Sequence, residues 1–105
     1  MAQRRMFSLK VIDTDNFLDM SVASRELYFQ LGMRADDDGF VSNPRRIMRM
    51  LGASDDDLRL LITKKFIIPM STNGVCVVTH WKVNNFIRPD RYEETQFKEE
   101  KARVS

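Results

Sequence analysis

The chain has 105 residues and a formal net charge of +2, a length that allows one domain with a modest core. Hydrophobic residues make up 43% and charged residues 30%, the balance of an ordinary globular protein. A lone cysteine excludes an internal disulfide, and no stretch approaches the roughly 20 apolar residues of a membrane span. The first residues also lack the apolar segment of a signal peptide. We therefore expect a protein of the reducing cytoplasm without membrane contact.

The first part of the chain predicts an extended arm followed by helices. Residues 3–12 are expected to form the arm, and residues 13–20 to form one or two helical turns capped by Asp13 or Asp15. Phe17 and Met20 are spaced to share a face of these turns.

A longer helix is expected over residues 21–35, and it is apolar on two sides. Its main stripe consists of Leu27, Tyr28, Leu31 and Ala35. Phe29 and Met33 form a second stripe, which is expected to meet the apolar arm of the same chain or of a neighbour. We therefore predict a homo-oligomer, most simply a two-fold dimer. Gly32 indicates a close packing contact, because glycine inside a helix costs about 1 kcal/mol relative to alanine.

Residues 36–65 predict a turn, a very short strand and two helices joined by a tight link. The turn covers residues 36–39, and the strand covers residues 40–42. Five residues have the types expected at helix caps and ends: Asn43, Pro44, Gly52, Ser54 and Asp57. The apolar faces of the two helices are expected to be Ile47, Met50 and Leu51 on the first, and Leu58, Leu61 and Ile62 on the second.

A β-hairpin is the expected structure after these helices. Asn73-Gly74 separates two apolar runs, residues 66–70 and 75–81, and is a strong signal for a two-residue turn. Such a turn pairs Thr72 with Val75 and Met70 with Val77. Pro69 places its strand at a sheet edge.

The order of these elements predicts an α+β fold, a winged helix-turn-helix with a three-helix core and a small antiparallel sheet. The hairpin would be the wing, and the helix after Ser54 the recognition helix. The domain is expected to span residues 1–91 with its N-terminal arm. Residues 92–105 are strongly charged and poor in apolar residues, so we expect a C-terminal tail or the start of a linker.

Several motifs resemble the N-terminal domain of phage replisome organisers, which are DnaD-like replication-initiation proteins of low-GC Gram-positive bacteria and their prophages. The motifs are RRMFS (4–8), LGMRADDDGFVSNP (31–44), RMLGASDDDL (49–58), KKFIIP (64–69) and HWKVNNFIRPDRY (80–92). The resemblance implies an oligomeric winged-helix domain that binds DNA and other replication proteins and has no catalytic activity. Family members usually continue into a second, helical domain.

Basic residues of the two central helices are the candidate DNA contacts. Arg45, Arg46 and Arg49 lie opposite the apolar face of the first helix, where they suit phosphates, although a solvated polar face is the alternative. The second helix offers Arg59, Thr63 and Lys64. Its three aspartates, 55–57, would face phosphates, and an outward Leu60 suits a thymine methyl group or a protein interface. We therefore expect weak sequence specificity.

The hairpin tip, residues 71–74, has no lysine or arginine. Positive charge returns at Lys82 and Arg88, interleaved with Trp81 and Phe86, and this mixture can grip a phosphate backbone and stack bases. Single-stranded DNA is therefore an alternative ligand to the duplex. For the two aromatic residues, membership of the core is the preferred alternative to base stacking, because large aromatic side chains dominate core burial.

No residues predict catalysis, a metal site or a cofactor. His80 and Cys76 lack ligand-spaced partners, and a calcium loop at residues 36–39 would place Arg34 and Arg45 at ligand positions. The expected function is duplex binding by a replication initiator without enzymatic activity. The alternatives are a protein-interaction or oligomerisation module of a primosome protein, or a winged-helix transcriptional regulator.

Overall fold

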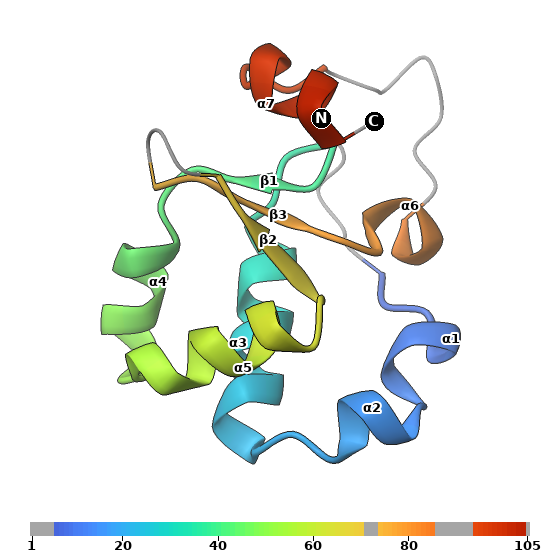
Figure 1. Ribbon diagram of the computed structural model, residues 1–105, viewed down its shortest axis with the longest axis vertical. Coiled ribbons are helices and arrows are strands. Elements are labelled where there is room, and N and C mark those ends of the chain that lie inside the picture. The colour runs from blue at the N-terminus through green and yellow to red at the C-terminus, as the bar shows by residue number, and fades with distance from the viewer. Residues whose placement is uncertain (1–5, 71–73, 86–93, 105) are drawn as a thin grey trace.

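The computed structural model describes residues 6–70, 74–85 and 94–104 and contains a three-stranded antiparallel sheet with helices on both sides (Figure 1). The strands are β1 (Phe40–Val41), β2 (Ile67–Pro69) and β3 (Cys76–Val78), in the order β1-β3-β2. The longer helices before the hairpin are α3 (Val22–Met33), α4 (Pro44–Leu51) and α5 (Asp55–Thr63). The other helices of the described residues are α1 (Leu9–Ile12), α2 (Asp15–Leu18), α6 (Trp81–Asn84) and α7 (Lys98–Val104). The α+β class and the predicted order of elements are confirmed.

The N-terminal segment differs from the extended arm that the sequence predicts. Residues 9–12 form α1 behind the cap Ser8, and α2 is capped by Thr14 rather than by Asp13 or Asp15. The Thr14 hydroxyl accepts a hydrogen bond from the amide of Phe17 (3.2 Å) and donates one to a backbone carbonyl of α1 (3.0 Å). A carboxylate cannot donate, so neither Asp13 nor Asp15 could bridge the two helical turns in this way.

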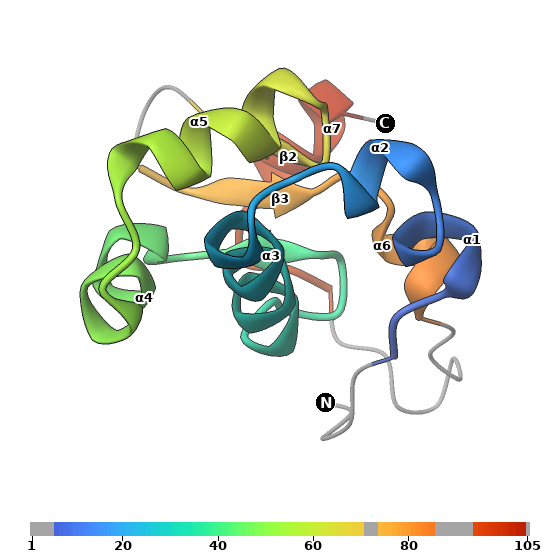
Figure 2. The same ribbon diagram turned by 90° about the horizontal axis from the view of Figure 1, so that it is seen from below.

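Phe29, one of the two residues in the second stripe of α3, is covered by the same chain. The ring of Phe7 packs edge-to-face on Phe29, with centroids 5.0 Å apart, and a Cβ at Gly32 would lie 2.7 Å from Phe7 ring carbons. The close contact predicted at Gly32 is therefore confirmed, as is the burial of the main stripe. The argument for a homo-oligomer then rests on Met33, whose side chain is 48% exposed. Figure 2 shows α3 between α4 and the α1–α2 segment.

The caps of α4 and α5 are confirmed. Asn43 accepts from the amide of Arg46, Gly52 adopts φ +72° at the end of α4, and Ser54 and Asp57 exchange both hydrogen bonds of a capping box. The predicted apolar face of α4 is wrong in one member, because Met50 is 58% exposed whereas Met48 is buried.

The same helical spacing explains the error in α4. Pro44, Ile47, Met48 and Leu51 also follow it, and this set faces the core. Leu60, expected on the outer face of α5, is half-buried against the core.

The hairpin is present, but its predicted register is wrong by two residues. Ile68 pairs with Val77, and the amide of Met70 donates to the carbonyl of Val75 (2.7 Å), so four residues, 71–74, lie between this last bonded pair. Gly74 adopts φ +70°, while Thr72 and Asn73 lie outside the described residues. A two-residue shift leaves every side chain on the same sheet face, so hydrophobic alternation cannot separate the two registers. Strand β2 is at the sheet edge, as Pro69 predicts.

The outer sheet face is apolar and is covered by the C-terminal segment (Figure 1). Phe97 packs on Phe40, with ring centroids 6.0 Å apart. The Thr95 amide donates to a buried carboxylate oxygen of Asp38 (2.9 Å), and Lys101 pairs with the other oxygen (3.3 Å). Polar anchors on the 36–39 turn therefore hold residues 94–104, a segment with few apolar residues, against the rest of the domain.

Within the described residues, no helix is long and apolar enough to cross a membrane.

Candidate nucleic-acid interface

The outer face of α4 carries three exposed arginines beside one exposed methionine. Ile47 and Met48 face the core. Because successive residues of a helix are about 100° apart, four side chains lie on the opposite face: Arg45, Arg49, Arg46 and Met50, in that order around the helix. Arg45 lies on the side toward α5, and Arg46 lies on the side away from it. The exposed arginine face predicted for this helix is thus present, and its role in binding DNA stays a prediction.

The three guanidinium groups differ in their partners. Arg45 forms an ion pair with Asp55 at the start of α5. Both side chains are largely exposed, so such a pair contributes at most about 1 kcal/mol and can exchange for a phosphate. Arg46 and Arg49 form no ion pair with any carboxylate in the described part of the chain. Their charges are available to an anionic ligand.

The outer face of α5 is more acidic than that of α4. Its exposed side chains are Asp55, Asp56, Arg59 and Thr63, and Arg59 pairs with Asp56 at 3.0 Å. The carboxylates stabilise the helix N-terminus through its dipole. The same carboxylates would repel phosphates if this end of the helix entered a groove.

The end of α5 contributes less to a DNA contact than its sequence suggests. Thr63 is exposed, but Lys64 is half-buried, and its ammonium group donates to the carbonyl of Asn16 (3.1 Å). Lys65 ends the helix with φ +66°. Of the predicted contacts on α5, Thr63 alone is exposed and unpaired within the described residues.

The remaining predicted contacts are Lys82 and Arg88. The backbone of Lys82 lies in α6, but its side chain, like the whole of Arg88 and Phe86, falls outside the described residues. Trp81 belongs to the core, where its indole N–H donates to the carbonyl of Asp37 (3.0 Å). The base-stacking alternative for Trp81 is therefore wrong.

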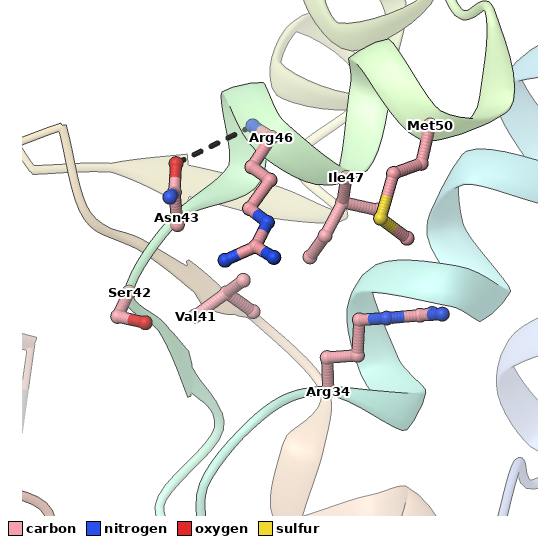
Figure 3. A pocket seen from close by; sticks show the side chains of 7 residues that line it. All are labelled: Arg34, Val41, Ser42, Asn43, Arg46, Ile47 and Met50. Atoms are coloured by element: carbon pink, nitrogen blue, oxygen red, sulfur yellow. Dashed lines mark hydrogen bonds between the residues drawn. The ribbon is translucent and has the colours of Figure 1, made fainter.

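A half-open hollow of about 270 Å³ lies beside α4, between its first turns, β1 and the end of α3 (Figure 3). Its apolar lining consists of Val41, Ile47 and Met50. Its polar lining consists of Arg34, Ser42, Asn43 and Arg46.

Arg34 is a residue that the sequence reasoning missed. It follows α3 directly, and its guanidinium Nη1 donates to the carbonyl oxygen (3.2 Å) and the side-chain oxygen (2.6 Å) of Gln30. These partners are neutral, so the positive charge stays uncompensated at the hollow. Arg34 and Arg46 are 12 positions apart, and no sequence periodicity could have joined them.

The titratable groups with shifted pKa values are buried in the core. Burial raises the pKa of the Cys76 thiol to about 12. Burial also raises the pKa of Tyr28, an effect that a hydrogen bond from Asn84 opposes. Both shifts keep these groups protonated near pH 7. In the described ranges, no three His, Cys, Asp or Glu side chains gather as metal ligands.

Comparison with known proteins returns no similarity: the chain matches no protein-family model, no curated protein and no solved structure.

Proposed function

We propose that this protein is the DNA-binding winged-helix module of a phage or prophage replication initiator. The observation that carries the proposal is the exposed arginine face of α4, Arg45, Arg46 and Arg49. In the proposed helix-turn-helix, α4 is the first helix. In complexes of this motif the first helix crosses the DNA backbone, where guanidinium groups bind phosphates well. The element order and the resemblance to phage replisome organisers support the same function.

The proposed binding is dominated by the backbone and has weak sequence specificity. Phosphate contacts supply affinity and register, whereas specificity needs donors that reach base edges. On α5 the donor Arg59 is engaged by Asp56, and Lys64 is engaged by the carbonyl of Asn16. For α5 to read bases, the Arg59–Asp56 ion pair and the Lys64–Asn16 hydrogen bond would both have to break. The exposed Asp55 and Asp56 would also lie close to the DNA phosphates.

A protein-interaction module is the second candidate function. The acidic outer face of α5 favours it, because this helix would meet phosphates with Asp55 and Asp56. The two functions predict different responses to salt and to loss of the arginines.

Binding of a labelled duplex measured across a salt series tests the DNA proposal. If each arginine neutralises one phosphate, replacing all three with alanine should make the slope of log affinity against log salt less negative by about 2.7. Affinity should fall by a similar factor for unrelated sequences. Lys10→Ala combined with Lys98→Ala removes exposed charge from α1 and α7 and serves as the control. An unchanged slope in the triple variant would exclude α4 as the phosphate-binding helix.

A further inference from the structure

The hollow beside α4 combines an apolar floor with a positively charged rim. Val41 and Ile47 are buried, with total exposures of 1% and 6%, and Met50 beside them is 58% exposed, so Met50 supplies most of the accessible apolar surface. Figure 3 shows Arg46 reaching from α4 over Val41, with Arg34 on the opposite side at the end of α3. Neither guanidinium is paired with a carboxylate of the described chain.

The apolar floor indicates a ligand that carries more than an anion. A phosphate or sulfate is strongly hydrated and gains nothing from contact with methyl groups and a thioether. An apolar side chain does gain, by about 25 cal/mol for each Å² that it removes from water. The uncompensated charges of Arg34 and Arg46 then select for carboxylates next to that side chain.

The lining does not suit nucleic acid. Proteins that hold single strands stack bases on aromatic side chains, and none of the residues lining the hollow is aromatic. The hollow also opens on the side of α4 that faces α3 and β1, whereas Arg45 and its partner Asp55 mark the side toward α5. A ligand in the hollow therefore leaves the outer face of α5 open.

We infer that the hollow is a docking site for an acidic segment of a partner protein. One apolar side chain of that segment rests on Val41, Ile47 and Met50, and flanking carboxylates bind Arg46 and Arg34. This goes beyond DNA binding and does not depend on it. Arg46 belongs to both surfaces, so a docked acidic segment competes with duplex for this arginine and weakens duplex binding.

A synthetic peptide tests the inference. The probe is a fluorescein-labelled peptide with one leucine between two pairs of aspartates in a glycine-serine background, and its binding is measured by anisotropy. Two control peptides replace the aspartates by asparagines, or the leucine by serine. Because both charge-assisted hydrogen bonds and apolar burial contribute, each control peptide is expected to bind about tenfold more weakly or worse.

Matched protein variants locate the site. Arg46→Gln and Met50→Ser should weaken binding of the aspartate–leucine peptide about fivefold or more. Arg49→Gln and Met33→Ser change the same residue types at exposed positions outside the hollow, and should change affinity by less than about twofold. All four positions are exposed, so unchanged melting temperatures will show that the variants fold. In NMR spectra the methyl signals of Ile47 and Met50 should shift on peptide addition, and those of Met33 should not.

Several outcomes would overturn the inference. The aspartate–leucine peptide could fail to saturate by millimolar concentration, or the serine control could bind equally well, which would indicate charge attraction alone. Equal losses in the variants inside and outside the hollow would exclude it as the site. If Met50→Ser weakens duplex binding as much as it weakens peptide binding, the hollow would be a nucleic-acid site. If the protein binds the peptide but not DNA, this inference stands and the proposed function is refuted.

Discussion

The contact between the N-terminal segment and α3 can be tested at Gly32. A Cβ built at this position would lie 2.7 Å from two ring carbons of Phe7, well inside van der Waals contact. Gly32→Ala therefore forces the ring to move, and overpacking of this kind costs about 1–3 kcal/mol. The same substitution removes a glycine from a helix interior, which favours folding by about 1 kcal/mol. In the parent chain we expect the free energy of unfolding to fall by about 0–2 kcal/mol, the difference of these terms.

A double-mutant cycle with Phe7→Ala separates the two effects. Without the ring nothing opposes the new Cβ, so Gly32→Ala should raise the free energy of unfolding by about 1 kcal/mol in that background. The difference between the backgrounds, about 1–3 kcal/mol, is the coupling of the two positions. Urea denaturation measures it, and Met6→Ala, which shortens an exposed neighbouring side chain, provides a background in which Gly32→Ala should behave as in the parent.

Measuring the coupling at several protein concentrations shows which chain supplies the Phe7 ring. Phe7 packs on Phe29 of its own chain, so the coupling should be the same at low and high concentration. Equal effects of Gly32→Ala in both backgrounds would refute the contact. A coupling that grows with concentration would instead place Phe7 of a second chain on α3, and would support the homo-oligomer predicted from the arm.

Three further predictions concern stability. Asp38→Ala should lower the free energy of unfolding by about 1–3 kcal/mol, because it leaves the buried amide of Thr95 unpaired. Glu94→Ala breaks exposed ion pairs and should cost less than about 1 kcal/mol. Equal losses of the two variants in urea denaturation would contradict the anchoring. Gly74→Val should lower the free energy of unfolding by about 1–2 kcal/mol, and Gly74→Asn should lower it less, because φ is +70° at this position. Equal melting temperatures for the two variants would argue against backbone strain. Since the pKa of Cys76 rises from 9.0 to about 12 on folding, the native thiol keeps its proton where the unfolded chain loses it, so stability should fall as pH rises from 9 toward 12. Cys76→Ala should flatten that decline, and an unchanged pH profile would show that the thiol is not buried.

Local backbone chemistry explains what the sequence predicted correctly. A cap depends on a side chain and an amide two or three residues away, so Asn43, Ser54 and Asp57 fix the starts of α4 and α5 without reference to the rest of the fold. Gly52 ends α4 for the same local reason. The buried stripe of α3 was also predicted correctly, because four apolar residues at helical spacing have one common face.

The errors occur where two arrangements satisfy the same local rule. Met48 and Met50 both extend a helical apolar set on α4, and packing against the core buries Met48 alone. The predicted and observed hairpin registers place the same side chains on each sheet face. Thr14 caps α2 because it can also donate to the turn before it, a contact that exists once α1 has formed.

The hollow beside α4 depends on residues that tertiary structure alone brings together. Arg34 and Arg46 flank one hollow because the end of α3 packs beside α4, and their separation in sequence carries no periodic signal. The C-terminal segment stays on the sheet because Asp38 offers it buried acceptors. The sequence by itself determined helices α3 to α5, the caps of α4 and α5, and the alternation of the strands, which are local properties of the backbone. Burial and charge neutralisation, which depend on neighbours distant in the chain, decided which exposed arginines remain available to a ligand.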